Sequence, residues 1–191
     1  MPTIFLASKS PRRQELLTLM GLPFQTLSVD ADESFPEHLS PEEIVRHISR
    51  SKAVAAKALV GPDDLVITAD TMVFLDDRKL GKPRDEADAF EMLSALSGRA
   101  HTVCTGVTLV QGEHILTESE ATRVRFAPLT EDTIRAYIQT GEPMDKAGAY
   151  GIQGKGSLLI EGIEGDFFNV MGLPVHHLSA MLRTFGVNVL S

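Results

Sequence analysis

The chain has 191 residues and a formal net charge of -8 at pH 7, and its hydrophobic share of 43% is that of an ordinary globular protein. This acidic balance argues against a nucleic-acid polymer as partner, because binding one requires a basic face. A single cysteine, Cys104, excludes an internal disulfide, and with no signal peptide or membrane span in view we expect a cytoplasmic protein with no membrane partner.

The first segment predicts a strand that leads directly into a helix. Residues 3–7 are an apolar, β-branched run, and Ser10 followed by Pro11 is a favourable helix start. Polar and basic side chains gather at this junction: Ser8, Ser10, Arg12 and Arg13. Free N–H groups and the helix dipole make such a junction an anion site, and a bound anion would account for arginines that oppose the dipole. Two solvated surface arginines are the alternative.

A second strand is expected at residues 24–29, followed by an acidic loop that contains Glu33. Carboxylates at a strand end can hold a divalent cation, although simple solvation is more common. A capping box at residues 40–43 predicts the next helix, whose apolar stripe consists of Ile44, Val45, Ile48 and Val54. Lys52 lies in this helix, and nothing local shows whether it points to solvent or to a site.

Residues 65–75 form an apolar run that contains one carboxylate, Asp70, followed by Thr71. A carboxylate in such surroundings is costly to desolvate, so it should be paired, hydrogen-bonded or metal-bound, which makes it a functional candidate. The structural alternative is a bulge or turn in which Asp70 caps backbone N–H groups.

Lys82 follows a hairpin turn predicted at residues 76–78 and can reach a phosphate as a point charge. The surrounding sequence is not a P-loop, because Asp76 replaces a required glycine and Pro83 replaces the serine or threonine.

The rest of the chain alternates helices and strands. Helices are expected at residues 85–96, from Thr130 to an end at Gly141 and after Pro174, and strands at residues 101–110, 114–127, 157–163, 167–171 and 187–190. Hairpins imply antiparallel pairing beside parallel strands, so the expected architecture is a mixed α/β sheet flanked by helices.

Glycines are concentrated between residues 141 and 172. Gly148, Gly151 and Gly154 recur every three residues, which either lets the backbone approach a ligand closely or packs a sharply bent loop against the sheet. Within this loop Gln153 offers one acceptor and two donors for the edge of a base.

At residues 8–13, 69–71, 80–83 and 145–154 the chain resembles the Maf family of nucleotide pyrophosphatases, in the branch that acts on dTTP and UTP. The resemblance spans the whole chain as a single domain, 1–191, and implies an elongated mixed sheet with a central cleft between two lobes, similar to inosine triphosphate pyrophosphatases. It also implies a nucleoside triphosphate substrate, a divalent metal such as Mg²⁺ or Mn²⁺, and products that are the monophosphate and pyrophosphate; it leaves a homodimer open.

The same resemblance implies roles for individual residues. Asp70 would be the general base, and Glu33 would help Asp70 to hold the metal. The residues that would hold the triphosphate are Ser8, Arg12, Arg13, Lys52 and Lys82, and the positions that match the specificity residues are Arg13, Thr71 and Gln153. Whether Asp70 is base, metal ligand or both stays open, as do modified pyrimidine nucleotides as substrates and a regulatory module of cell division with slow hydrolysis.

Overall fold

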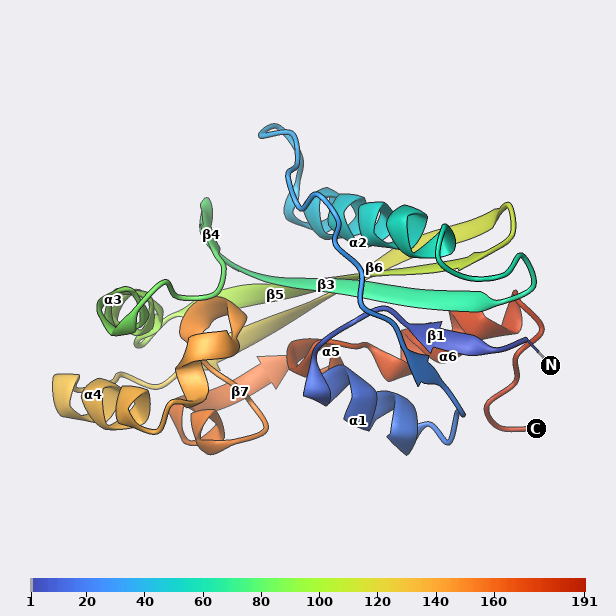
Figure 1. Cartoon of the computed structure of the whole chain (residues 1–191). Helices are drawn as coiled ribbons and strands as arrows, with labels where there is room; N and C mark the ends of the chain where they lie inside the picture. Colours follow the sequence, from blue (N-terminus) through green and yellow to red (C-terminus); the bar gives the residue numbers. More distant parts are fainter. Residues whose placement is uncertain (1) are drawn as a thin grey trace. The chain divides into compact units, whose positions relative to one another are not determined.

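The computed structural model describes residues 2–191 and shows a mixed α/β fold (Figure 1). Over this range the strands are β1 (Ile4–Leu6), β2 (Gln25–Thr26), β3 (Leu65–Leu75), β4 (Arg78–Leu80), β5 (Ala100–Gln111), β6 (His114–Phe126) and β7 (Ile160–Glu164). The helices are α1 (Pro11–Leu19), α2 (Pro41–Lys57), α3 (Glu86–Leu96), α4 (Glu131–Gln139), α5 (Phe167–Met171) and α6 (Val175–Arg183). Three short 3₁₀ helices are η1 (Glu142–Asp145), η2 (Ala147–Ala149) and η3 (Lys155–Leu159).

The strands form one sheet in the order β2-β1-β3-β5-β6-β7, with β4 paired to β3. Strand β1 pairs in parallel with β2 and β3, whereas β4 and β7 pair antiparallel with β3 and β6. The predicted mixed sheet flanked by helices is therefore confirmed. The elongation and the cleft stay predictions.

The chain divides into two compact units. The first unit contains the residues up to Asp70, Thr105–Glu120 and Gly172–Ser191, and the second contains Thr71–Cys104 and Ala121–Met171. Ser8, Arg12, Arg13, Glu33, Lys52 and Asp70 all belong to the first unit, whereas Thr71, Lys82 and Gln153 belong to the second.

In the first unit, α1 and α2 lie on opposite sides of the β1–β3 region (Figure 1). The predicted capping box of α2 is present, since Ser40 Oγ accepts from Glu43 N at 3.3 Å and Glu43 Oε2 accepts from Ser40 N at 2.8 Å. The predicted stripe is wrong at Val54, whose residue surface is 53% exposed, while Ala53 and Ala56 are buried. A step of about 100° per residue turns Val54 away from the face that Ile48 and Ala56 share.

Helix α2 packs closely against the sheet because β5 has a glycine, Gly106, at the point of contact. A Cβ on Gly106 would lie 2.2 Å from the Val45 carbonyl oxygen, so no larger residue fits between helix and strand. Buried hydroxyls complete the contact: Ser49 Oγ lies 2.9 Å from Thr108 Oγ1, and Thr68 Oγ1 donates to the Ser49 carbonyl at 2.6 Å. These contacts fix the turn of α2 that carries Lys52.

Some predicted strands differ from the structure. Residues 167–171 form helix α5, because Asp166 Oδ1 accepts the backbone N–H groups of Phe168 and Asn169 at 2.7 and 3.1 Å and so caps a helix start. Residues 187–190 form no strand, and of the predicted strand 24–29 only Gln25–Thr26 forms the strand β2. Strand β7 begins at Ile160, after η3.

The second unit has its own apolar core, to which α3, α4 and the middle of the sheet contribute. Within it His101 Nε2 lies 2.6 Å from the Tyr150 hydroxyl, and both rings pack edge-on against Phe126. Burial lowers the pKa of His101 to about 4, so the imidazole is neutral at pH 7. His101 is 3% exposed and therefore belongs to the core of the second unit.

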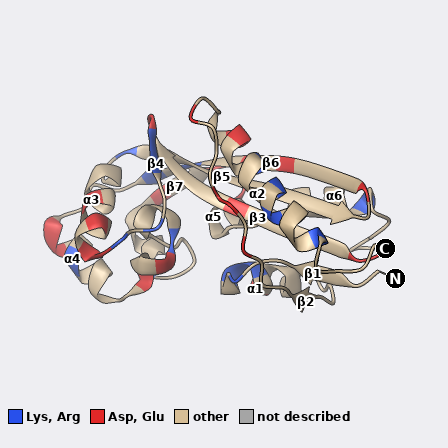
Figure 2. Ribbon diagram, turned by 45° about the horizontal axis from the view of Figure 1, so that its top comes forward, with Lys and Arg blue, Asp and Glu red and all other residues tan. Residues whose placement is uncertain are grey.

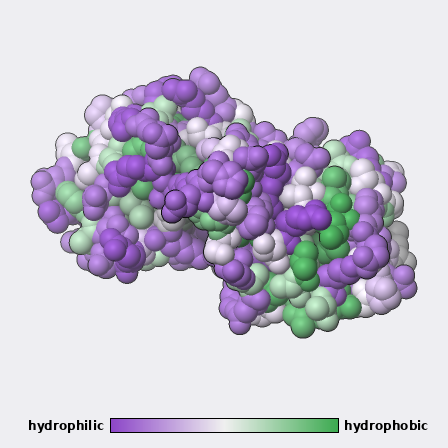
Figure 3. Space-filling view, turned by 90° about the horizontal axis from the view of Figure 1, so that it is seen from above, coloured by the Kyte–Doolittle hydropathy of each residue, from purple (hydrophilic) through white to green (hydrophobic). Residues whose placement is uncertain are grey.

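Within residues 2–191, no helix combines the length and the apolar character that crossing a bilayer requires. The face seen in Figure 3 is largely hydrophilic and carries one hydrophobic band.

Replacing Gly106 by alanine should destabilise the protein by about 1–3 kcal/mol or more, because the new methyl group overpacks the α2–β5 contact. Urea denaturation measures the change. Gly81→Ala is the matched control, since a Cβ there meets no atom within 4 Å. Equal stabilities of the two variants would contradict the close approach of α2 to β5.

Candidate active site

The junction between β1 and α1 has the predicted helix start. Ser10 is the N-cap, and its Oγ accepts from Arg13 N at 3.5 Å, while Pro11 occupies the first helical turn. Ser8 Oγ accepts the backbone N–H of Ser10 at 3.2 Å, which turns the chain after the strand. This local sequence thus places Ser8 and both arginines at a helix N-terminus, the end that favours anions. Figure 2 shows the basic colour gathered at the start of α1.

Arg13 is half-buried and held in place by the fold. Its Nε donates to the Gly172 carbonyl at 2.7 Å, and its Nη1 lies 3.4 Å from Ser8 Oγ. Burial lowers the pKa of Arg13, and the charge of Asp70 opposes that shift. Arg13 is therefore not a solvated surface arginine, and its guanidinium lies within electrostatic reach of Asp70.

Lys52 points to the sheet and not to solvent. Its Nζ lies 3.0 Å from Asp70 Oδ1 and 3.1 Å from Glu33 Oε1, and the Lys52 side chain is only 16% exposed. One ammonium from α2 thus joins a carboxylate of β3 to a carboxylate of the acidic loop.

Asp70 lies in the middle of the continuous strand β3, with a side chain that is 13% exposed. Its Oδ1 pairs with the Lys52 ammonium, so the carboxylate serves an ion pair and not a turn. Its Oδ2 is buried and has no hydrogen-bond partner among the described residues. Because a buried carboxylate oxygen without a partner is costly, this atom is a strong candidate for contact with a cation or a reacting group.

A divalent cation fits the donor set of this region. Among residues 2–191, no three His, Cys, Asp or Glu side chains are grouped to form an all-protein metal cage. Mg²⁺ does not require one, since it commonly uses one or two carboxylates and completes its shell with water and substrate phosphates. Glu33 and Asp70, which share Lys52, supply two carboxylates of this kind.

The other three predicted site residues lie in the second unit. Thr71 directly follows Asp70 in β3, so its side chain leaves the opposite face of the strand. Lys82 is exposed just after β4, and Gln153 is exposed between η2 and η3. The structure thus brings together Asp70, Lys52, Glu33 and the α1 junction, and the contribution of these three residues stays a prediction.

The glycine-rich segment packs as a bent loop. Gly148 has a φ of 72°, and a Cβ on it would lie 2.8 Å from a methyl group of Val73 in β3. Its N–H donates to the Gly81 carbonyl at 3.1 Å. Sequence reasoning missed the residues that hold the remainder of this loop, Tyr137 and Glu142, although an acidic residue next to so many glycines was a usable signal.

The family model described as "Maf-like protein" matches residues 3–185. The chain is 51% identical to the dTTP/UTP pyrophosphatase of Moorella thermoacetica, over 99% of this chain and 98% of that protein. It is 50% identical to the dTTP/UTP pyrophosphatase of Symbiobacterium thermophilum, over 97% of this chain and 95% of that protein.

Solved structures with low sequence identity share the fold. The Staphylococcus aureus Ham1 protein aligns with a TM-score of 0.54 and 15% identity, over 96% of this chain and 99% of that one. A HAM1 protein from Coxiella burnetii aligns with a TM-score of 0.51 and 16% identity, over 96% and 100%. The family-model match over residues 3–185 and the relatives about 50% identical show that the chain belongs to the Maf family.

Proposed function

We propose that this protein is a nucleoside triphosphate pyrophosphatase that hydrolyses dTTP and UTP to the monophosphate and pyrophosphate. The observation that carries the proposal is the nearly buried carboxylate of Asp70, whose Oδ2 is unpartnered among the described residues, beside the cations of α1 and α2. Binding a nucleotide alone does not require such a carboxylate. The names of the relatives, about 50% identical, support the choice of dTTP and UTP.

We infer that the cationic side chains of the first unit bind the phosphates of the substrate. A triphosphate carries about four negative charges, so an acidic protein must concentrate its cations locally to bind one. We assign this role to Ser8, Arg12 and Arg13 at the N-terminus of α1 and to Lys52, with Lys82 added from the second unit. Thr71 and Gln153, with Arg13, are assigned to recognition of the nucleoside.

Asp70 is assigned as the general base. Its Oδ2 accepts a proton from a water molecule, whose oxygen attacks the α-phosphorus as the bond from that phosphorus to the bridging oxygen breaks. Pyrophosphate leaves with the electron pair of that bond. Lys52 orients the carboxylate through Oδ1, and the arginines stabilise the charge that develops on the leaving phosphates.

A divalent metal, Mg²⁺ or Mn²⁺, is the cofactor that Glu33 and Asp70 would hold. When bound, such a cation neutralises negative charge on the phosphates and polarises the phosphoryl group.

The expected products of UTP are UMP and pyrophosphate, because Asp70 acts at the α-phosphorus while the terminal phosphates are clamped. Ion-exchange chromatography of the reaction with Mg²⁺ or Mn²⁺ identifies them. Formation of UDP and orthophosphate would contradict the assigned site of cleavage. A panel that includes dTTP, UTP and modified pyrimidine triphosphates ranks the substrates.

Arg12→Ala should raise KM and lower kcat, with a loss of about tenfold to a hundredfold in kcat/KM, the range expected for a hydrogen bond to a charged group. Steady-state kinetics at low salt gives both constants. Arg183→Ala, at the exposed end of α6, is the control for loss of a surface charge. If both variants behave as the unmodified enzyme does, Arg12 is not a phosphate ligand.

Asp70→Asn should lower kcat by about 10²-fold or more, because the amide keeps the shape and lacks the proton acceptor. Its melting temperature should fall, since the exchange leaves the nearly buried Lys52 ammonium with the exposed Glu33 carboxylate in place of the Asp70 ion pair. Turnover and melting temperature are measured on the same preparation. A destabilised variant with normal turnover would refute the assignment of Asp70.

A further inference from the structure

The carboxylate of Glu142 is the centre of a hydrogen-bond network in the glycine-rich loop. Its Oε1 accepts from the Tyr137 hydroxyl at 2.7 Å and from Gly156 N at 3.0 Å, and its Oε2 accepts from Lys155 N at 2.9 Å. Burial raises the pKa of Glu142, but these hydrogen bonds outweigh it and hold the pKa below its usual value. The network therefore uses the ionised carboxylate, which only accepts hydrogen bonds.

Tyr137 extends the network to the other side of the loop. The residue is 4% exposed at the end of α4, and its hydroxyl oxygen accepts the backbone N–H of Gly151 at 3.0 Å while its proton goes to Glu142. One tyrosine and one glutamate thus bind three backbone N–H groups of the same loop.

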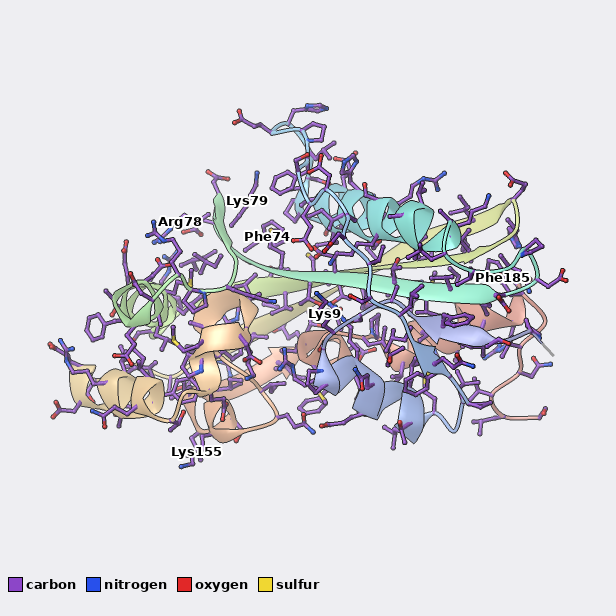
Figure 4. All side chains as sticks on the ribbon, in the orientation of Figure 1. Lys9, Phe74, Arg78, Lys79, Lys155 and Phe185 are labelled. Carbon is purple, nitrogen blue, oxygen red and sulfur yellow. The ribbon has the colours of Figure 1, made fainter. Side chains whose placement is uncertain are left out.

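These three N–H groups bracket Gln153. Gly151 lies two residues before it and Lys155 two residues after it, so both flanks of Gln153 are held by the Tyr137–Glu142 pair. The side chain of Lys155 points outward (Figure 4), so Lys155 contacts Glu142 through its backbone N–H group. The side chain of Gln153 itself is exposed.

Two glycines of this loop lie close against the same pair. A Cβ on Gly154 would lie 2.4 Å from Glu142 Oε2, and one on Gly156 would lie 2.8 Å from the Tyr137 hydroxyl. Lys146 also binds this loop, because its Nζ donates a hydrogen bond to the Glu142 carbonyl at 2.8 Å. The backbone is thus packed tightly around two side chains that face no assigned ligand.

We propose that Tyr137 and Glu142 are positioning residues that set the selectivity of the enzyme for the base, by holding the backbone on both sides of Gln153. The proposal rests on the proposed function and on the assignment of Gln153 to nucleoside recognition. It predicts that loosening the pair affects discrimination between bases more than it affects hydrolysis itself.

Glu142→Gln tests whether the network needs the negative charge of Glu142. The variant places an amide NH₂ group, which is a donor, opposite a backbone N–H group, so one hydrogen bond of the network is lost. Tyr137→Phe is the milder second variant, which keeps the ring in the core and removes only the bridging hydroxyl. The readout is the ratio of kcat/KM for UTP to that for CTP. This ratio does not depend on how much of the enzyme is folded, so a purely structural role leaves it unchanged.

We expect the ratio to fall about tenfold in Glu142→Gln, the scale of one lost hydrogen bond, and by a smaller factor in Tyr137→Phe. In a Gln153→Ala background the same substitutions should change the ratio little, because residues that act through one another are not additive. Glu131→Gln, an exposed carboxylate of α4, is the control. Unchanged ratios in both variants, or fully additive effects with Gln153→Ala, overturn the proposal.

Binding measurements distinguish failure of the proposed function from failure of the positioning role. Calorimetric dissociation constants for UMP and CMP give the same selectivity ratio without catalysis. A parent protein that prefers UMP yet hydrolyses no triphosphate overturns the proposed function, and the variants still test the positioning role. Amide hydrogen exchange at residues 151–156 should rise in both variants, and unchanged exchange contradicts the role of the pair.

Discussion

The ion pair between Lys52 and Asp70 is the interaction on which the first unit depends. Both side chains are nearly buried, so either charge alone would be costly, and each is tolerated because the other lies 3.0 Å away. The pair forms only if α2 lies at a fixed height above β3. Gly106 provides that height by allowing the helix backbone to touch the strand, and Thr68 fixes the rotation through the Ser49 carbonyl.

Local signals in the sequence predicted a large part of this structure. Ser10 and the capping box at Ser40 fix helix starts through hydrogen bonds within three residues, so they are visible without any tertiary contact. Asp70 was recognisable because one carboxylate interrupts an apolar strand. Residues 167–171 were wrongly predicted as a strand because their apolar run suggests one. The local signal for a helix was the preceding Asp166, which caps the start of α5.

Other parts of the site depend on contacts between distant segments and carried no local signal. The direction of Lys52 is decided by the packing of α2 on β3. The position of the Arg13 guanidinium is decided by a backbone carbonyl at Gly172, which any residue type would present. The pair of Tyr137 and Glu142 likewise acts on backbone N–H groups, so the sequence shows only the glycines that make room for it.

The discontinuity of the first unit has a consequence for how the protein is made. Its segments flank and interrupt those of the second unit, and Arg13 donates to a carbonyl 159 positions further along the chain. A ribosome therefore releases α1, α2 and β3 long before it adds Gly172. During synthesis the Arg13 side chain lacks this carbonyl, and the N-terminal end of α1 reaches its final form only after the second unit has been translated in full.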